Sequence, residues 1–302
     1  MVTRFAPSPT GLLHLGHVRS AIEGWRRARV AGGRFLLRIE DIDLGRCRPE
    51  FTAAIEEDLR WLGLSWDGPV RVQSRHLPDY AAVLDGLRGR GLLYPCFCTR
   101  ADVARAVTAQ GGARMGPDGP VYPGTCRALP AAERARRLRA GEPHALRLDM
   151  ARALQAVPGP LFYRELGGSM PASGGPLRRE TPGVAPGAGR LVRCDPAAFG
   201  DVVLARKDVP ASYHLCVTHD DALQGVTLVT RGEDLRPSTD LHRLLQALMG
   251  WPEPLYAHHP LLLGPDGQRL SKSAGSRPIR AWREAGASPQ AVLALAESAG
   301  VA

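Results

Sequence analysis

The first 40 residues contain two short apolar segments separated by a turn and an amphipathic stretch. Residues 2–6 are typical of a buried strand that runs into a turn rich in proline and glycine. A helix is predicted over 17–30, with Ile22 and Trp25 on its apolar face, and a second strand over 34–39. Strand, turn, helix and strand in this order form a βαβ unit, whose two strands lie parallel in one sheet. The chain is therefore predicted to be an α/β protein built on a parallel sheet.

Further elements follow along the chain. Pro49 is suited to the first turn of a helix, and apolar residues recur after it at helical spacing. The same reasoning predicts helices starting at Pro49, around 80–87 and over 238–249, and strands over 226–231 and at 261–263 before a tight Asp266-Gly267 turn.

Two segments interrupt this regular pattern. Between residues 94 and 148, cysteines, glycines and arginines dominate, and we expect an inserted subdomain rather than more of the sheet. Residues 167–190 differ again, since 13 of these 24 residues are Gly, Pro or Ser. Such a composition buries too little apolar surface to order itself, so a mobile loop is expected there.

The overall composition is that of an ordinary globular chain. Its 302 residues are 44% hydrophobic and 23% charged, which is enough to bury a substantial core. No apolar run approaches the roughly 18 residues of a membrane helix, and no signal-peptide core follows Met1. We therefore expect a cytoplasmic protein with no membrane partner. The net charge of +9 favours a polyanionic partner such as nucleic acid, with a merely arginine-rich composition as the alternative.

The first candidate for chemistry is the turn that joins the first strand to the first helix. It reads Pro7-Ser-Pro-Thr-Gly-Leu-Leu-His-Leu-Gly-His17. Unpaired N–H groups and the helix dipole favour phosphate at such a helix start. Gly16 lets a nucleotide approach the backbone, while His14 and His17 can face one side and donate to phosphate oxygens. A lone H-x-G-H is more often a surface turn, but the eleven-residue context favours a nucleotide site.

The second candidate lies near the end of the chain, at Arg269-Leu-Ser-Lys-Ser273. The chain contains 39 Lys+Arg, yet only two of these are lysines, Lys207 and Lys272. A lysine in such a background indicates a need for a compact, mobile ammonium. A loop bearing Ser271, Lys272 and Ser273 can close over a nucleotide and meet the charge that develops on pyrophosphate. A solvated basic loop is the alternative, and the sequence assigns no role to Lys207.

Three of the six cysteines lie near one another, at Cys96, Cys98 and Cys126. In a cytoplasmic chain such a cluster indicates a metal, whereas isolated cysteines indicate packing. We expect one zinc ion per chain, with a structural role, because it would fix a loop-rich insert that lacks an apolar core. The spacing leaves the fourth ligand open between His144 and a water molecule.

Taken together, these segments resemble the class I aminoacyl-tRNA synthetases of the glutamyl/glutaminyl branch. The matching motifs are Arg4-Phe-Ala-Pro-Ser-Pro-Thr-Gly11, His14-Leu-Gly-His17, Arg38-Ile-Glu-Asp41, Thr230-Arg-Gly-Glu-Asp-Leu235 and Arg269-Leu-Ser-Lys-Ser273. The resemblance covers residues 1 to about 275. It implies a Rossmann-type catalytic domain in two halves, 1–94 and 199–302, with 95–198 as an inserted zinc-binding and acceptor subdomain.

The resemblance also implies roles for individual residues. ATP would be bound by His14, Gly16, His17, Ser271, Lys272 and Ser273, of which His14, His17 and Lys272 would be catalytic. L-Glutamate would be bound by Arg4, Phe5, Ala6, Pro7, Ser8, Glu40, Tyr213 and Arg231. This fits the chemistry, because a buried glutamate needs arginines for its carboxylates and an acid for its ammonium group. The resemblance adds Tyr122 as the fourth zinc ligand, and Mg2+ would arrive with ATP.

Two features are similar to a shortened subfamily, the glutamyl-queuosine tRNA(Asp) synthetases. One is the cysteine–tyrosine zinc signature. The other is an end 30 residues after Lys272, which implies that no anticodon-binding domain follows. The expected reaction is ATP-dependent activation of L-glutamate to glutamyl-adenylate and transfer to the cyclopentenediol of queuosine in the anticodon of tRNA(Asp), by a monomer. The alternatives are a truncated enzyme that charges tRNA(Glu) and a catalytically silent RNA-binding paralogue.

Overall fold

The computed structural model describes residues 1–112, 114–167, 189–262 and 277–298. The helices are α1 (Leu15–Val30), α2 (Pro49–Trp61), α3 (Leu77–Gly89), α4 (Arg100–Ala109), α5 (Ala131–Arg139), α6 (Met150–Gln155), α7 (Tyr213–Leu223), α8 (Ser238–Met249), α9 (Ile279–Glu284) and α10 (Pro289–Ser298). The strands are β1 (Val2–Phe5), β2 (Arg34–Ile39), β3 (Arg71–Val72), β4 (Leu93–Cys96), β5 (Met115–Gly116), β6 (Gly119–Pro120), β7 (Ala145–Leu148), β8 (Phe162–Glu165), β9 (Arg190–Arg193), β10 (Val203–Ala205), β11 (Leu228–Gly232) and β12 (Leu255–His259). Three short 3-10 helices are η1 (Gln73–His76), η2 (Pro196–Phe199) and η3 (Glu233–Leu235).

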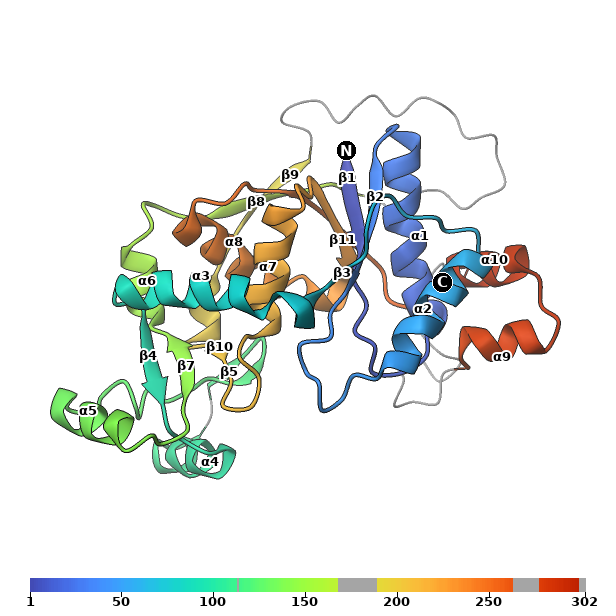
Figure 1. Ribbon diagram of the computed structural model, residues 1–302. Coiled ribbons are helices and arrows are strands. Elements are labelled where there is room, and N and C mark those ends of the chain that lie inside the picture. Colours follow the sequence, from blue (N-terminus) through green and yellow to red (C-terminus); the bar gives the residue numbers. More distant parts are fainter. Residues whose placement is uncertain (113, 168–188, 263–276, 299–302) are drawn as a thin grey trace.

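The centre of the molecule is a parallel sheet in two groups of strands (Figure 1). In the first group β2 lies between β1 and β3, and all three run parallel. In the second group β12 lies between β11 and β8, again in parallel, while β9 adds an antiparallel edge. The backbone N–H of Thr227 donates to the carbonyl oxygen of Val2 at 2.9 Å, which places β1 beside β11. The predicted α/β fold with a parallel sheet is confirmed.

Helix α1 packs directly on the sheet, and its local sequence explains how. His14 caps the N-terminus of the helix, accepting from the backbone N–H of Gly16 through its imidazole ring. Gly24 faces the sheet, where an added Cβ would lie 2.9 Å from Oγ1 of Thr230 and 3.3 Å from the ring of Phe35. A side chain at this position would therefore push the helix away from the strands, and with it the residues at the helix start.

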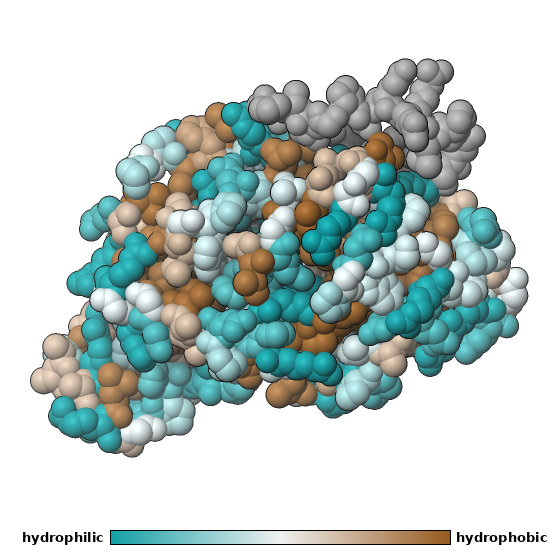
Figure 2. Space-filling view, turned by 45° about the horizontal axis from the view of Figure 1, so that its top comes forward, coloured by the Kyte–Doolittle hydropathy of each residue, from teal (hydrophilic) through white to brown (hydrophobic). Residues whose placement is uncertain are grey.

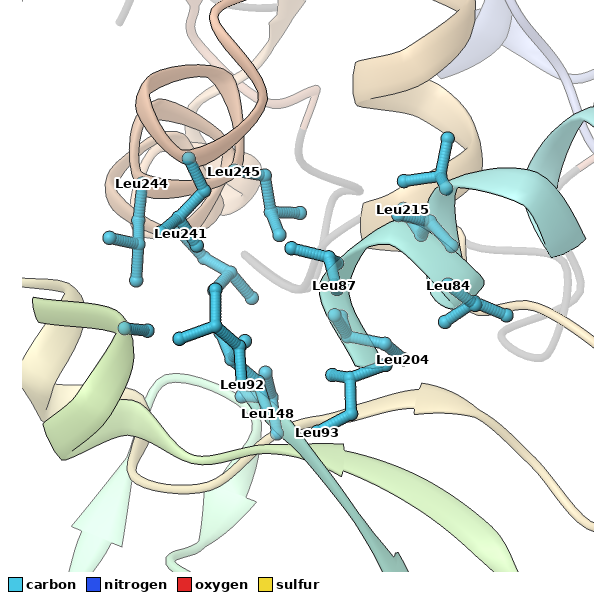
Figure 3. Packing of buried hydrophobic residues seen from close by; sticks show 14 of the residues in the cluster. Leu84, Leu87, Leu92, Leu93, Leu148, Leu204, Leu215, Leu241, Leu244 and Leu245 are labelled. Atoms are coloured by element: carbon cyan, nitrogen blue, oxygen red, sulfur yellow. The ribbon is translucent and has the colours of Figure 1, made fainter. Parts of the chain in front are cut away.

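Two large apolar clusters stabilise the domain. One is formed around α1, α2, β1 and β2 and includes residues of the C-terminal helices α9 and α10. The other joins α3, α7 and α8 to β4, β7 and β10, and Figure 3 shows how leucines from these elements meet. Helix α8 contributes Leu241, Leu244 and Leu245, each with no exposed surface. The helices predicted around 80–87 and over 238–249 are thus confirmed as core elements.

A separate antiparallel sheet joins a strand of the expected insert to strands at and beyond its limits. Strand β7 lies between β4 and β10, and this sheet stands at the end of the molecule that also carries α4 and α5 (Figure 1). The pairings do not follow the expected limits of 95–198. Strands β8 and β9 fall inside that range but belong to the parallel sheet, whereas β10 lies beyond it and pairs with β7. Local composition could not predict these strand pairings, because they depend on how segments distant in the sequence pack together.

One predicted strand was placed wrongly. Residues 261 and 262 lie outside regular structure, and the strand of this region is β12, residues 255–259. The strand was not predicted because His258 and His259 interrupt its apolar pattern. In the fold, both side chains are nevertheless buried and have polar partners. The predicted turn at Asp266 and Gly267 lies outside the described residues, as does the 167–190 loop except for its ends.

The surface carries no extended apolar face in the view of Figure 2, where hydrophobic residues occur in small groups among hydrophilic ones. Within the described ranges, no helix is both long and apolar enough to cross a membrane.

Candidate active site

A cleft of about 650 Å³ lies at the carboxyl ends of β1, β2 and β11. This is the edge at which parallel sheets bind their ligands. Although they come from distant parts of the chain, many of the predicted site residues line it: Arg4, Phe5, Ala6, Pro7, Ser8, His14, Gly16, His17, Glu40, Tyr213 and Arg231. Ser271, Lys272 and Ser273 lie outside the described residues.

The two histidines at the start of α1 are held in a defined tautomer. The Nδ1 of His14 accepts from the backbone N–H of Gly16 at 3.1 Å, and the Nδ1 of His17 accepts from the backbone N–H of His14 at 3.1 Å. Both neutral rings therefore carry their proton on Nε2. Their ring centroids are 3.8 Å apart. Paired N–H donors at a helix N-terminus suit the oxygens of a polyphosphate.

Behind the first strand lies a buried network of two arginines and two acids. Nε and Nη2 of Arg4 donate to the two carboxylate oxygens of Asp221 at 2.8 and 3.2 Å. Arg38, with no exposed surface, donates to Asp221 at 2.8 Å and to Glu40 at 3.3 Å. Sequence reasoning assigned no role to Asp221 or to Arg38, although Arg38 begins one of the matching motifs, because the two residues meet in an ion pair that spans 183 residues.

The network sets the pKa values of its acids in opposite directions. Burial raises the pKa of Glu40 to about 7, although Arg38 and Arg4 oppose this rise. Burial acts in the same sense on Asp221, but the adjoining Arg4 and Arg38 outweigh it and hold the pKa of Asp221 below its usual range. Asp221 is therefore the permanent counter-ion, and Glu40 is a carboxylate that ionises near neutral pH.

Arg231 differs from Arg4, because its hydrogen bonds go to neutral groups. It donates to Nε2 of His258 at 3.2 Å, to Nδ1 of His242 at 3.1 Å and to Oγ1 of Thr239 at 2.5 Å. Among the described residues, no carboxylate forms an ion pair with this guanidinium group, which is 4% exposed. A buried cation of this kind is suited to an anionic ligand.

A second cavity of about 480 Å³ adjoins the first. Both cavities are lined by Ser8, Thr10, Glu40, Arg46 and Tyr213. Tyr213 begins α7, directly after the helix cap Ser212, and burial raises the pKa of its hydroxyl. The cavities thus meet at Glu40 and Tyr213, so that two substrates can lie against each other there.

Among the described residues, the three predicted cysteines are a group that could hold a metal ion. The Sγ atoms of Cys96, Cys98 and Cys126 all lie within 4.8 Å of one another. The hydroxyl of Tyr122 is 3.5 Å from Sγ of Cys96 and 3.4 Å from Sγ of Cys98. His144, the alternative ligand, is not part of the group. Its Nδ1 lies 3.1 Å from the carbonyl oxygen of Glu142. Three thiolates at this spacing are ligands that suit zinc, and the phenol of Tyr122 is near enough to complete the set.

Lys207 has a contact that the sequence did not foresee. Its Nζ donates to the carbonyl oxygen of Phe97 at 2.7 Å, between two of the cysteines. The neighbouring Arg206 and Val209 line the second cavity. Lys207 therefore ties the cysteine loop to the wall of that cavity.

The fold and the cleft agree with comparisons with known proteins. The family described as tRNA synthetases class I (E and Q), catalytic domain, matches residues 1–164 and 188–302. The chain belongs to this family, and it is accordingly a ligase of the class I synthetase type.

Individual similar proteins show which members of this family the chain resembles. The chain is 48% identical over 298 residues to the glutamyl-Q tRNA(Asp) synthetase of Rhodobacter capsulatus, covering 98% of this chain and 99% of that one. It is 43% identical to the protein of the same name from Nocardia farcinica, covering 97% and 82%. A solved glutamate tRNA ligase of Elizabethkingia meningosepticum, in complex with its amino acid, superposes with a TM-score of 0.75 at 28% identity. This chain spans 60% of the length of that ligase.

Proposed function

We propose that this enzyme activates L-glutamate with ATP and transfers the glutamyl group to the cyclopentenediol of queuosine in the anticodon of tRNA(Asp). The observation that carries the proposal is the single cleft that brings together the donors of the α1 N-terminus, the Glu40 carboxylate and the Arg231 guanidinium. The names of the similar proteins from Rhodobacter capsulatus and Nocardia farcinica support the choice of acceptor.

In the first step, a carboxylate oxygen of glutamate attacks the α-phosphorus of ATP, and pyrophosphate leaves. His14 and His17 hold the phosphates through their Nε2 protons, and Lys272 neutralises charge on the leaving pyrophosphate. Gly16, Ser271 and Ser273 complete the proposed ATP site. Mg2+ bound to ATP would offset the triphosphate charge.

Recognition of glutamate requires two anionic groups and one cationic group to be paired. We assign the ammonium group to Glu40, because this acid is buried at the end of β2 and faces the cleft. Arg231 is suited to a carboxylate, since its charge has neutral hydrogen-bond partners. Arg4, Phe5, Ala6, Pro7, Ser8 and Tyr213 form the remaining walls of the proposed amino-acid site.

In the second step, a hydroxyl oxygen of the acceptor attacks the acyl carbon, AMP leaves and the hydroxyl proton is lost. We place the acceptor in the second cavity, which adjoins the amino-acid site at Glu40 and Tyr213. Its walls combine apolar residues with polar groups that can bind a diol, among them Asp43, Gln73 and Ser212.

We further propose that one zinc ion is held by Cys96, Cys98, Tyr122 and Cys126. The segment 95–198 would then border the acceptor cavity, to whose wall Lys207 joins it through Phe97. The four side chains would complete a closed ligand set, which is typical of structural zinc. The segment would need such a fixation because the apolar cluster around the cysteines is small and helices α4 and α5 contain no buried residue.

The proposal is tested with labelled glutamate and two tRNA pools, one with queuosine and one without. Label found only on queuosine-containing tRNA(Asp) would support it. Label on tRNA(Glu), independent of queuosine, would make the chain a minimal charging enzyme. Glutamate-dependent exchange of pyrophosphate into ATP, run without tRNA, tests the activation step, and its absence with Mg2+ and zinc present would leave a silent RNA-binding paralogue.

A further inference from the structure

A chain of hydrogen bonds leads from Arg231 out of the cleft to the expected insert. Nη1 of Arg231 lies 3.1 Å from Nδ1 of His242, and Nε2 of His242 lies 3.1 Å from Nδ1 of His214. Nε2 of His214 then lies 2.9 Å from Oδ2 of Asp118. Asp118 lies in the turn between β5 and β6, so the chain of hydrogen bonds joins residues of β11, α8, α7 and this turn.

The chemistry of the two ends dictates where the protons lie. Arg231 has only N–H donors, so Nδ1 of His242 must accept and the ring must carry its proton on Nε2. That proton is donated to Nδ1 of His214, whose own proton is therefore on Nε2 and is donated to the carboxylate of Asp118. Every link points from Arg231 towards Asp118, and the carboxylate at the far end fixes this direction.

Burial makes the direction of the chain matter. His242 is 3% exposed, and burial together with Arg231 and His214 holds its pKa well below the usual range, so the ring is neutral. The rings of Tyr213 and Phe199 pack against His214 at centroid distances of 5.3 and 6.0 Å. A wrong tautomer of His242 would place an N–H against the guanidinium group in a medium where an unmade hydrogen bond is costly.

The other side of Arg231 is built on the same plan. Nδ1 of His258 lies 2.9 Å from Oε2 of Glu165, which leaves Nε2 to accept from Nε of Arg231. Each imidazole that contacts Arg231 is therefore linked to a carboxylate. His258 contacts Glu165 directly, and His242 is linked to Asp118 through His214. This arrangement orients the guanidinium group without pairing its charge with a carboxylate.

We propose that Asp118, His214 and His242 are positioning residues of the amino-acid site, which keep Arg231 oriented to bind a substrate carboxylate. The turn of the β5–β6 hairpin thereby contributes to the selection of a dicarboxylic amino acid, although it lies outside the cleft. The inference rests on the proposed function only in the identity of this amino acid.

The first test is glutamate-dependent pyrophosphate exchange without tRNA, comparing wild type with Asp118→Ala, Asp118→Asn and His214→Ala. Asp118→Ala and His214→Ala are expected to raise the KM for glutamate about 10-fold, the order of one hydrogen bond to a charged group, and to leave the KM for ATP within about 2-fold. Asp118→Asn is expected to raise it by only about 3-fold, since the amide oxygen still accepts from His214. The proposal would be overturned if the KM values for glutamate and ATP rose equally. It would also be overturned if the KM for glutamate did not rise in Asp118→Ala or His214→Ala.

Two control variants separate this role from general effects. Met115→Ala changes an exposed residue of the same hairpin, and Asp85→Ala removes an exposed acid that pairs with Arg88 on α3. Both are expected to keep the wild-type KM for glutamate. Thermal unfolding of every variant shows whether it is folded. A rise of the KM for glutamate in either control would contradict a specific role of the hydrogen-bond chain from Arg231 to Asp118.

A second test does not depend on activity. The 15N chemical shifts of the imidazole nitrogens report the tautomer of each histidine in the intact protein. His242 and His214 are expected to be neutral with the proton on Nε2, and Asp118→Ala is expected to change the shifts of both rings. A proton on Nδ1 of His242 would exclude the proposed chain of hydrogen bonds. If wild type showed no exchange, the proposed function would fail, while these shifts would still decide whether this chain of hydrogen bonds exists.

Discussion

The parallel-sheet domain and the expected insert are stabilised in different ways. The domain buries two large apolar clusters, to which several helices and strands contribute. In the insert, the cluster around the cysteines comprises Tyr94, Cys96, Phe97, Tyr122 and Cys126. Helices α4 and α5, both fully described, contain no buried residue. The domain can fold on apolar burial, whereas we propose that the cysteine cluster of the insert depends on a bound zinc ion.

Removal of the proposed zinc ion tests this difference most strongly. Chelation is expected to abolish hydrogen-exchange protection around Cys96 and Cys126, because ligand binding supplies most of the folding free energy of such small sites. Protection in α1 and α8 should persist, and glutamate-dependent pyrophosphate exchange should stay within about 3-fold of its starting value. Mass spectrometry of deuterium uptake checks both regions.

The matched variants are Cys126→Ser, within the thiol group, and Cys194→Ser, a buried cysteine outside it. Only the former should mimic chelation and lower the zinc content. Loss of protection in α8 on chelation would show that the two regions unfold together.

The same substitution in each region provides the second test. Leu245→Ala, in the core formed by α8, is expected to lower the free energy of unfolding by about 2–5 kcal/mol, through lost burial and a cavity. Leu129→Ala, where the leucine is only partly buried against the cysteine cluster, should cost about 1 kcal/mol or less. Chemical denaturation measures both, and an equal loss would mean that the insert has a core as effective as that of the domain.

The pH dependence of activation tests the cleft itself. Because burial raises the pKa of Glu40 to about 7, the acid is protonated below this pH and cannot pair with the ammonium group. The kcat/KM for glutamate is therefore expected to fall about 10-fold per pH unit below 7 and to level off above it.

Glu40→Gln provides the comparison for the pH profile. This variant should have a low kcat/KM without the break near pH 7. A wild-type profile that is flat between pH 5.5 and 8.5, as chosen assay limits, would contradict the assignment of Glu40.

The smallest effect is expected at Lys207, which links the two regions. Lys207→Met removes the hydrogen bond to the carbonyl oxygen of Phe97 and should slow transfer to tRNA about 3-fold, as one hydrogen bond predicts. Activation without tRNA should not change. Lys272→Met, at the other lysine, should instead impair activation, and the reverse pattern would refute the two assignments.

Much of the fold could be predicted from local patterns. The strand–turn–helix–strand order, the Pro49 helix and the apolar spacing of α3 and α8 each depend on residues a few positions apart. The strand of β12 was missed because His258 and His259 do not fit an apolar pattern, yet both are buried with polar partners. The limits of the insert stay a prediction, while the pairing of β8 and β10 across them could not be seen in the local pattern.

In the candidate site, too, local contacts could be predicted from the sequence and long-range contacts could not. By itself, the sequence determined the group at the start of α1, since His14, Gly16 and His17 lie within one helical turn and orient one another. It also determined the thiol cluster, apart from the position of Tyr122. Only the tertiary structure decided that Asp221 neutralises Arg4, and that Arg231 is held by two imidazoles. Those contacts join segments up to 217 residues apart. They form because apolar packing of the sheet and helices brings the segments together, where a buried charge is costly unless it is paired.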